Sequence, residues 1–87
     1  MVAISNSEVL YDSGSAERIV LYKLDNVDTG DTFDVVSAFS EVKSAVFLVP
    51  STLTGVGTAT AVGTVITLTL ATMSNDSVHL LVVGSTA

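Results

Sequence analysis

The stretch AVGTVITLTLATMSNDSVHLLVV, residues 61–83, decides the fold class of this 87-residue chain. Along residues 62–71 two sets of side chains alternate, which is the two-residue period of a β-strand. One face carries Val62, Thr64, Ile66, Leu68 and Leu70, and the other carries Val65, Thr67, Thr69 and Ala71. The polar run SNDS at residues 74–77 predicts a turn, because short polar side chains hydrogen-bond to the nearby backbone. Residues 78–83 are apolar on both faces, which is typical of a strand covered on both sides, in a sandwich or between subunits. We therefore expect two strands joined as a closing hairpin.

Further strands are expected upstream of this pair. The segment ERIVLYKL, residues 17–24, is apolar on both faces apart from its charged ends. Residues 42–49 form another apolar run, and Pro50 ends it because proline has no N–H to give to a sheet. A weaker strand at residues 56–62 turns at Gly63 into the closing pair. These patterns predict an all-β fold, a small antiparallel β-sandwich or open barrel of about five to six strands.

The length allows one domain. Residues 11–83 are expected to form a single β domain, with residues 1–10 as an N-terminal arm or edge strand before it. Residues 84–87 are expected to form a short polar C-terminal tail. Residues 35–40 predict a turn or one short helical turn, with a short strand as the alternative. Asp34 is placed to cap that segment, because a carboxylate accepts hydrogen bonds from the free amides at a helix start.

The composition favours strands and association. Hydrophobic residues make up 48% of the chain, with 15 valines and no tryptophan. Valine and threonine are branched at Cβ and pack well on a pleated surface. A chain of this length buries only about 60–65% of its unfolded surface. It has no cysteine and no plausible zinc cluster, so oligomerisation is the remaining way to stabilise a thin core. We expect a homo-oligomer.

The charge argues against two classes of partner. The formal net charge is −6, from nine acids and three bases, whereas a nucleic-acid-binding protein needs a basic surface. No apolar run reaches the roughly 18 residues of a membrane-spanning helix, and the first ten residues lack the pattern of a secretory signal. Residues 44–75 carry no charge. We interpret that span as core, or as surface that meets another protein.

One short motif suggests an enzyme. Asp28-Thr29-Gly30 matches the triplet of retroviral-type aspartic proteases, in which two subunits each supply one carboxylate of a dyad. That family places the triplet directly after an apolar strand, whereas Asp25 and Asp31 crowd this position, and extra carboxylates would disturb the shared proton of the dyad. We interpret the triplet as an acidic turn and keep a dimeric aspartic protease as a minor alternative.

Other candidate sites also favour structural interpretations. The acidic loop at residues 25–34 has a carboxylate at every third position, which does not fit an EF-hand, and whether it binds an ion stays open. The glycines at Gly55 and Gly57 begin a phosphate-loop pattern, but Thr60 stands where the third glycine belongs. His79, the single histidine, is expected to be a half-buried strand residue. We therefore predict no catalytic, cofactor-binding or metal-binding residues, no cofactor and no enzymatic activity.

Three features together resemble the small virion proteins encoded near the major capsid gene of tailed bacteriophages. They are the strand ERIVLYKL followed by an acidic loop with GDTFDV, the central strand ending at Pro50, and the segment GTVITLTLATMSNDSVHLLVVG near the C-terminus. The resemblance implies a β-rich, often trimeric protein that binds the major capsid protein on the outside of the capsid as a decoration or cement protein. It implies location in the virion, at the capsid surface, and it supplies no catalytic residue.

Two alternatives remain open beside capsid decoration. One is a head-fibre or tail-associated role, and the other is a cell-surface binding module, for instance one that recognises a carbohydrate. Sugar platforms are usually exposed aromatic rings, of which this chain offers few: Tyr11, Tyr22, Phe33, Phe39 and Phe47. Thr67 and Thr69 test the closing pair directly. Charge placed there is expected to be tolerated if that face meets water and to break assembly if it meets a partner.

Overall fold

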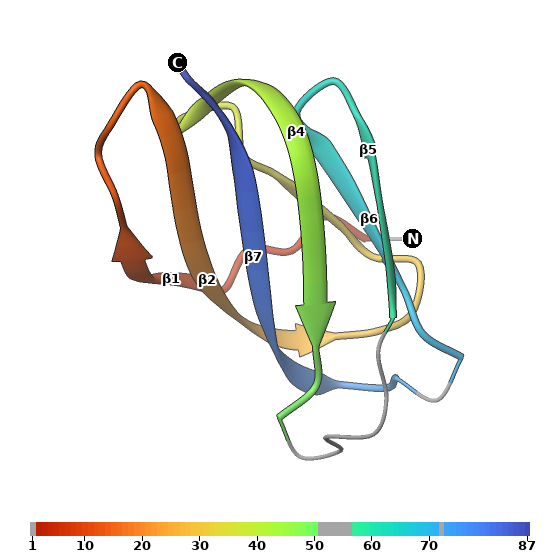
Figure 1. Ribbon diagram of the computed structural model, residues 1–87. Helices are drawn as coiled ribbons and strands as arrows, with labels where there is room; N and C mark the ends of the chain where they lie inside the picture. The colour runs from red at the N-terminus through yellow and green to blue at the C-terminus, as the bar shows by residue number, and fades with distance from the viewer. Residues whose placement is uncertain (1, 51–56, 72) are drawn as a thin grey trace.

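Two antiparallel sheets packed face to face form the protein (Figure 1). The computed structural model describes residues 2–50, 57–71 and 73–87. Within these ranges lie seven strands, β1 (Ser7–Asp12), β2 (Glu17–Val27), β3 (Thr32–Asp34), β4 (Phe39–Leu48), β5 (Thr58–Val62), β6 (Val65–Thr69) and β7 (Asp76–Thr86). The larger sheet has the order β1-β2-β7-β4 and the smaller one β3-β6-β5. The prediction of an all-β sandwich is confirmed, with seven strands in the described ranges instead of five or six.

Alternating burial in β2 and β7 places their inner side chains in the core. The two strands pair in antiparallel register, so that directly opposed residues share a face. The inner pairs are Val20 with Val82, Tyr22 with Leu80, and Leu24 with Val78. All six side chains are buried. Each large apolar side chain removed from water in this way stabilises the fold by about 1.5–3 kcal/mol.

The smaller sheet closes the core from the other side. Ile66 and Leu68 of β6 are fully buried, which confirms the face predicted from their spacing. Tyr22 of the larger sheet and Phe33 of the smaller one meet edge to face, with ring centroids 5.0 Å apart and planes at 72°. This geometry is favourable for aromatic pairs and joins the two layers directly.

The expected closing hairpin is wrong, although both of its strands exist. β6 pairs with β3 and β5 in the smaller sheet, whereas β7 pairs with β2 and β4 in the larger one. The connection crosses from one layer to the other, and Met73 within it is buried in the core. The Met73 N–H donates to the Leu70 carbonyl at 2.8 Å, and its own carbonyl accepts from the Thr29 N–H at 3.2 Å. In the larger sheet β7 has a hydrogen-bonded partner on each edge.

Strands also extend into segments that were expected to be irregular. β2 continues to Val27 through a register shift after Leu24, where Asn26 has a φ of 58°. Within the expected acidic loop, residues 32–34 form β3. β7 continues through residues 84–86, so the expected polar tail is mostly strand. Val56, the expected first residue of the weak strand, lies outside the described residues.

Residues 35–38 form one turn, and the described part of the chain contains no helix. The Phe39 N–H donates to the Val35 carbonyl at 2.9 Å, which closes the turn. Asp34 Oδ1 accepts from the Val36 N–H at 3.0 Å, which confirms the predicted cap. A helix able to cross a membrane is therefore also absent from the described ranges.

The first residues of the chain contact both sheets in turn. Ala3 forms an isolated parallel bridge with Thr32. The Ile4 N–H donates to the Thr32 carbonyl at 2.8 Å, and the Thr32 N–H donates to the Val2 carbonyl at 3.0 Å. β1 then pairs with β2 in the other layer. The beginning of the chain thus ties the two sheets together along one side.

Candidate interaction surface

The outer faces of the two sheets differ in chemistry. On the smaller sheet the outward side chains are mainly threonines, at Thr32, Thr58, Thr60, Thr67 and Thr69. On the larger sheet the outward side chains in the middle of the three longest strands are mainly apolar. We call them the apolar face: Ile19, Leu21, Val46, Leu48, Leu81 and Val83. The exposed side chains of the charge-free span at residues 44–75 are therefore largely threonines, and this span contributes only Val46 and Leu48 to the apolar face.

Strand register assembles the apolar face. Leu81 of β7 stands directly opposite Leu21 of β2 on one side and Val46 of β4 on the other. Tyr11 of β1 stands opposite Leu21, so one row of four side chains crosses the whole sheet. The exposed fractions are 57% for Tyr11, 54% for Val46 and 36% for Leu81. Side chains this exposed are unusual in such number on one sheet face.

A hollow lies within this face, towards Leu48 and His79. It measures about 390 Å³ and is lined by Leu21, Val46, Phe47, Leu48, His79 and Leu81. His79 lies between Lys23 and Leu48 in the register of the three strands. It is half-buried, which confirms the prediction for this residue. Among the described residues that line the hollow, His79 is the one group suited to acid–base catalysis.

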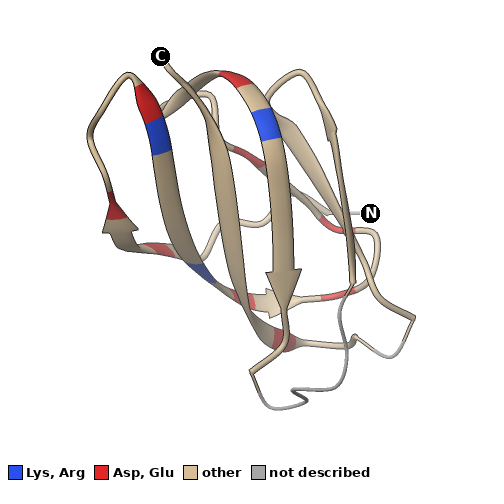
Figure 2. Ribbon diagram, viewed as in Figure 1, with Lys and Arg blue, Asp and Glu red and all other residues tan. Residues whose placement is uncertain are grey.

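Charged and polar pairs border the apolar face at both ends. At one end Lys43 Nζ lies 2.6 Å from Glu17 Oε1, which raises the pKa of Lys43. At the other end Ser77 Oγ donates to Asp25 Oδ1 at 2.9 Å. Figure 2 shows the middle of β2, β7 and β4 free of charged residues. An apolar centre with a polar border is the usual anatomy of a protein–protein contact.

The border carries charges of both signs. Glu8 of β1 stands opposite Lys23 of β2. Glu41 of β4 lies beside Lys43 and contributes to the rise in the pKa of Lys43. With Glu17 and Asp25, the border holds four acids and two bases, which is two of the six net negative charges of the chain. The other four net charges lie outside this surface.

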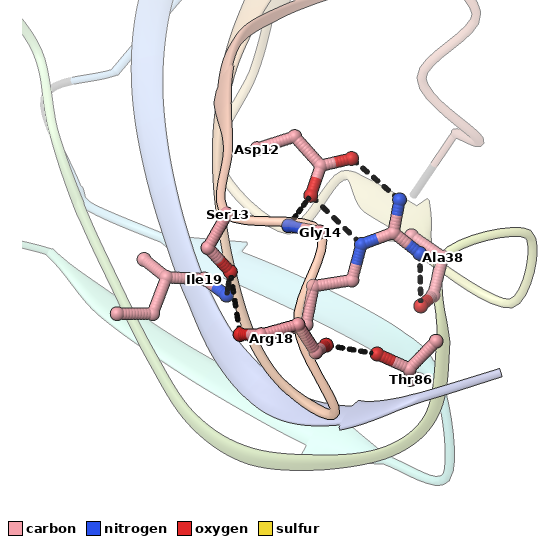
Figure 3. Close-up of polar contacts among 8 residues, drawn as sticks. Asp12, Ser13, Gly14, Arg18, Ile19, Ala38 and Thr86 are labelled. Atoms are coloured by element: carbon pink, nitrogen blue, oxygen red, sulfur yellow. Dashed lines mark hydrogen bonds and ion pairs between the residues drawn. The ribbon is translucent and has the colours of Figure 1, made fainter.

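A second polar cluster holds one end of the sandwich together (Figure 3). Arg18 Nε donates to Asp12 Oδ1 at 2.9 Å, and Arg18 Nη1 donates to the Ala38 carbonyl at 2.9 Å. The hydrogen bond from Arg18 lowers the pKa of Asp12 to about 2. Thr86 Oγ1 donates to the Ser15 carbonyl nearby. The guanidinium thus joins the β1–β2 turn to the segment before β4, which is a structural role.

The carboxylates of the acidic loop point to separate partners. Asp25 accepts from Ser77, as described above. Asp28 accepts from the Asn75 N–H at 2.7 Å, and the buried Asp31 accepts from the Asp28 N–H at 2.9 Å. In the described ranges no three side chains of the metal-ligating types gather at one point. The regularly spaced carboxylates of this loop therefore accept hydrogen bonds from separate backbone and hydroxyl donors.

The protease-like triplet forms a tight turn against β6. The Gly30 N–H donates to the Leu68 carbonyl at 2.7 Å, and Gly30 has a φ of 89°. Thr29 Oγ1 accepts from the Leu70 N–H at 3.0 Å. These contacts give the triplet the structural role that the acidic-turn interpretation assigns to it. In the glycine-rich segment, Gly55 lies outside the described residues, while Gly57 is packed so closely on the Phe47 ring that a Cβ would lie 2.0 Å from it.

The apolar face was not located from the sequence. The charge-free span at residues 44–75 contributes two of the six residues of the face, whereas four come from β2 and β7. The signal that could have found it was the apolar character of both faces of residues 17–24 and 78–83. In a sandwich of two layers only one face of a strand is covered, so the other face of such a strand remains for a partner.

The sequence matches no family model and no curated protein, and the fold matches no solved structure. The apolar face and its charge distribution are therefore the observations on which a functional proposal can rest.

Proposed function

We propose that this protein is a structural, non-enzymatic virion subunit that decorates the outside of a bacteriophage capsid, where it binds the major capsid protein and copies of itself. The observation that carries the proposal is the apolar face. A wide apolar sheet surface with a polar border is typical of proteins that act by contact with other proteins. The sequence resemblance supplies the class of partner.

The distribution of charge supports the same role. Four of the six net negative charges lie away from the apolar face and its border. Acidic groups on the remaining surface would keep decorated particles apart in solution. The threonine-bearing outer face of the smaller sheet is hydrated and carries one charge, at Asp34.

An exposed sheet edge offers a second kind of contact. Every residue of β1 is exposed, and β1 ends the larger sheet. An edge strand can pair with a strand of another protein through backbone hydrogen bonds. In the proposed role β1 is the edge that meets the capsid lattice.

Particles that lack this protein provide the test. Purified protein is added to capsids from a strain in which the gene has been deleted, and the bound protein is measured by co-sedimentation and native mass spectrometry of the particles. We expect saturable binding and a restored resistance to heat and osmotic shock. Particles from the deletion strain that keep their composition and their resistance would refute the proposal.

A further inference from the structure

We infer that the apolar face is the contact between two copies of this chain, which pair face to face about a two-fold axis. The inference deepens the proposed function, on which it rests for the view that the chain acts through protein contacts. It assigns a partner to the apolar face and leaves the β1 edge for the capsid. The resemblance implies trimers, whereas the geometry of a single apolar face points to a pair.

The charge distribution favours a second copy as the partner. Two chains of net charge −6 repel each other over most of their surfaces. The apolar face itself carries no charge, and two of the three bases of the chain, Lys23 and Lys43, lie in its border among four acids, which leaves two of the six net charges there. Face-to-face pairing therefore brings two uncharged centres together and points the other four net charges outwards.

The area of the face also suits such a pair. Four strands about 4.8 Å apart, over about nine residues at ~3.3 Å each, cover roughly 500 Å² in projection. Because side chains project from the sheet, its accessible area is larger than its projected area and approaches the ~800 Å² per partner that a stable interface buries. That is roughly a sixth of the 4776 Å² of accessible surface of the chain. Sheets commonly stack face to face at ~10 Å through interdigitating apolar side chains.

The symmetry follows from there being one such surface in the described part of the chain. In a two-fold pair the same patch meets itself, so one apolar face on each copy is sufficient. A closed trimer needs two different complementary patches on each subunit. The outer face of the smaller sheet carries mainly threonines and one exposed apolar pair, Val62 opposite Val65, which is too small to be a counterpart.

Two matched variants test the inference in the purified full-length protein. Leu81→Asp places a charge at the centre of the apolar face, and Thr67→Asp places the same charge at the centre of the other outer face. Sedimentation velocity over a range of concentrations should show a two-chain species for the wild type and for Thr67→Asp. Leu81→Asp should raise the dissociation constant about 100-fold or more, because each pair contains the substitution twice.

Folding and salt dependence are controlled in the same experiment. Far-UV circular dichroism establishes whether each variant is folded, and Val46→Asp, on the more exposed edge strand β4, replaces Leu81→Asp if that variant is unfolded. Added salt should strengthen pairing or leave it unchanged, because it screens the repulsion between the acidic chains. Marked weakening by salt would instead indicate an interface held by ion pairs and would overturn the inference.

Failure of this inference is distinguishable from failure of the proposed function. A wild type that stays a single chain at all concentrations, or that forms three-chain species, overturns the face-to-face pair even if it binds capsids. A two-chain species that does not bind capsids supports the pair and refutes the decoration role.

Discussion

Removal of the buried carboxylate of Asp31 should destabilise the fold more than removal of any exposed acid in the same loop. Asp31 is 5% exposed. Its Oδ2 accepts from the Asp28 N–H at 2.9 Å, and its Oδ1 accepts from the Val2 N–H at 3.2 Å. Asp31→Ala leaves the partly buried Asp28 N–H without this acceptor and releases the first residues of the chain from the turn.

The magnitude follows from these two bonds. A hydrogen bond to a charged group contributes about 1.5–3 kcal/mol to stability. Val2 is 65% exposed, so water replaces much of its bond, and the loss is set mainly by Asp28. We expect Asp31→Ala to lower the free energy of unfolding by about 2–3 kcal/mol, which is a fall in Tm of roughly 10–20 °C for a domain of this size. Asp31→Asn keeps one acceptor oxygen and should lose about 1 kcal/mol.

Urea unfolding followed by far-UV circular dichroism measures these differences at one fixed protein concentration. Asp34→Ala is the matched control, because it removes one negative charge from the same loop but from an exposed cap, and should cost about 1 kcal/mol. An unchanged m-value shows that the variants unfold from the same compact state. The reasoning is refuted if Asp31→Ala is no less stable than Asp34→Ala.

Two further predictions concern the larger sheet and its polar cluster. A Cβ at Gly84 would lie 2.0 Å from the backbone carbonyl oxygen of Glu41. Gly84→Ala should therefore lower the urea midpoint by an amount equivalent to about 1–3 kcal/mol. Ser85→Ala, at the next position, should change the midpoint little, and equal midpoints for the two variants would contradict the close approach. The hydrogen bond from Arg18 lowers the pKa of Asp12 from 3.8 to about 2, so the stabilising contribution of this carboxylate is complete above about pH 4 and is lost as the pH falls towards about 2. The difference in urea midpoint between the wild type and Asp12→Asn should shrink over that interval, and a difference that stays constant would refute the role of Arg18.

The strands of this protein could be predicted from the sequence, because alternation is a local signal. Ile66 and Leu68 share a face through their spacing alone, and the structure buries both. The cap at Asp34 was also predictable, since it depends on residues that are two positions apart. Each of these features is fixed by neighbours along the chain.

The pairing of β6 and β7 could not be predicted in the same way. A turn at residues 74–77 is compatible both with a hairpin and with a crossing between layers. The choice depends on β2 and β4, which lie far away in the sequence and give β7 two hydrogen-bonded neighbours. The burial of Met73 is one consequence, because its side chain enters the core from the connection that crosses between the two sheets.

The location of the apolar face depended on that same pairing. Leu21, Leu81 and Val46 form one row only because β7 lies between β2 and β4. Their side chains were visible in the sequence as the second apolar face of each strand. Without the strand order, nothing placed them side by side.

Crosslinking of single-cysteine variants tests most directly whether the apolar face joins two copies. The chain contains no cysteine, so Leu81→Cys and Thr67→Cys each supply one defined thiol, and a short thiol-reactive crosslinker can bridge sheets about 10 Å apart. We predict that Leu81→Cys gives a covalent species of two 8.9 kDa chains and that Thr67→Cys stays almost entirely a single chain. Equal crosslinking of the two variants, or more with Thr67→Cys, would contradict the face-to-face pair.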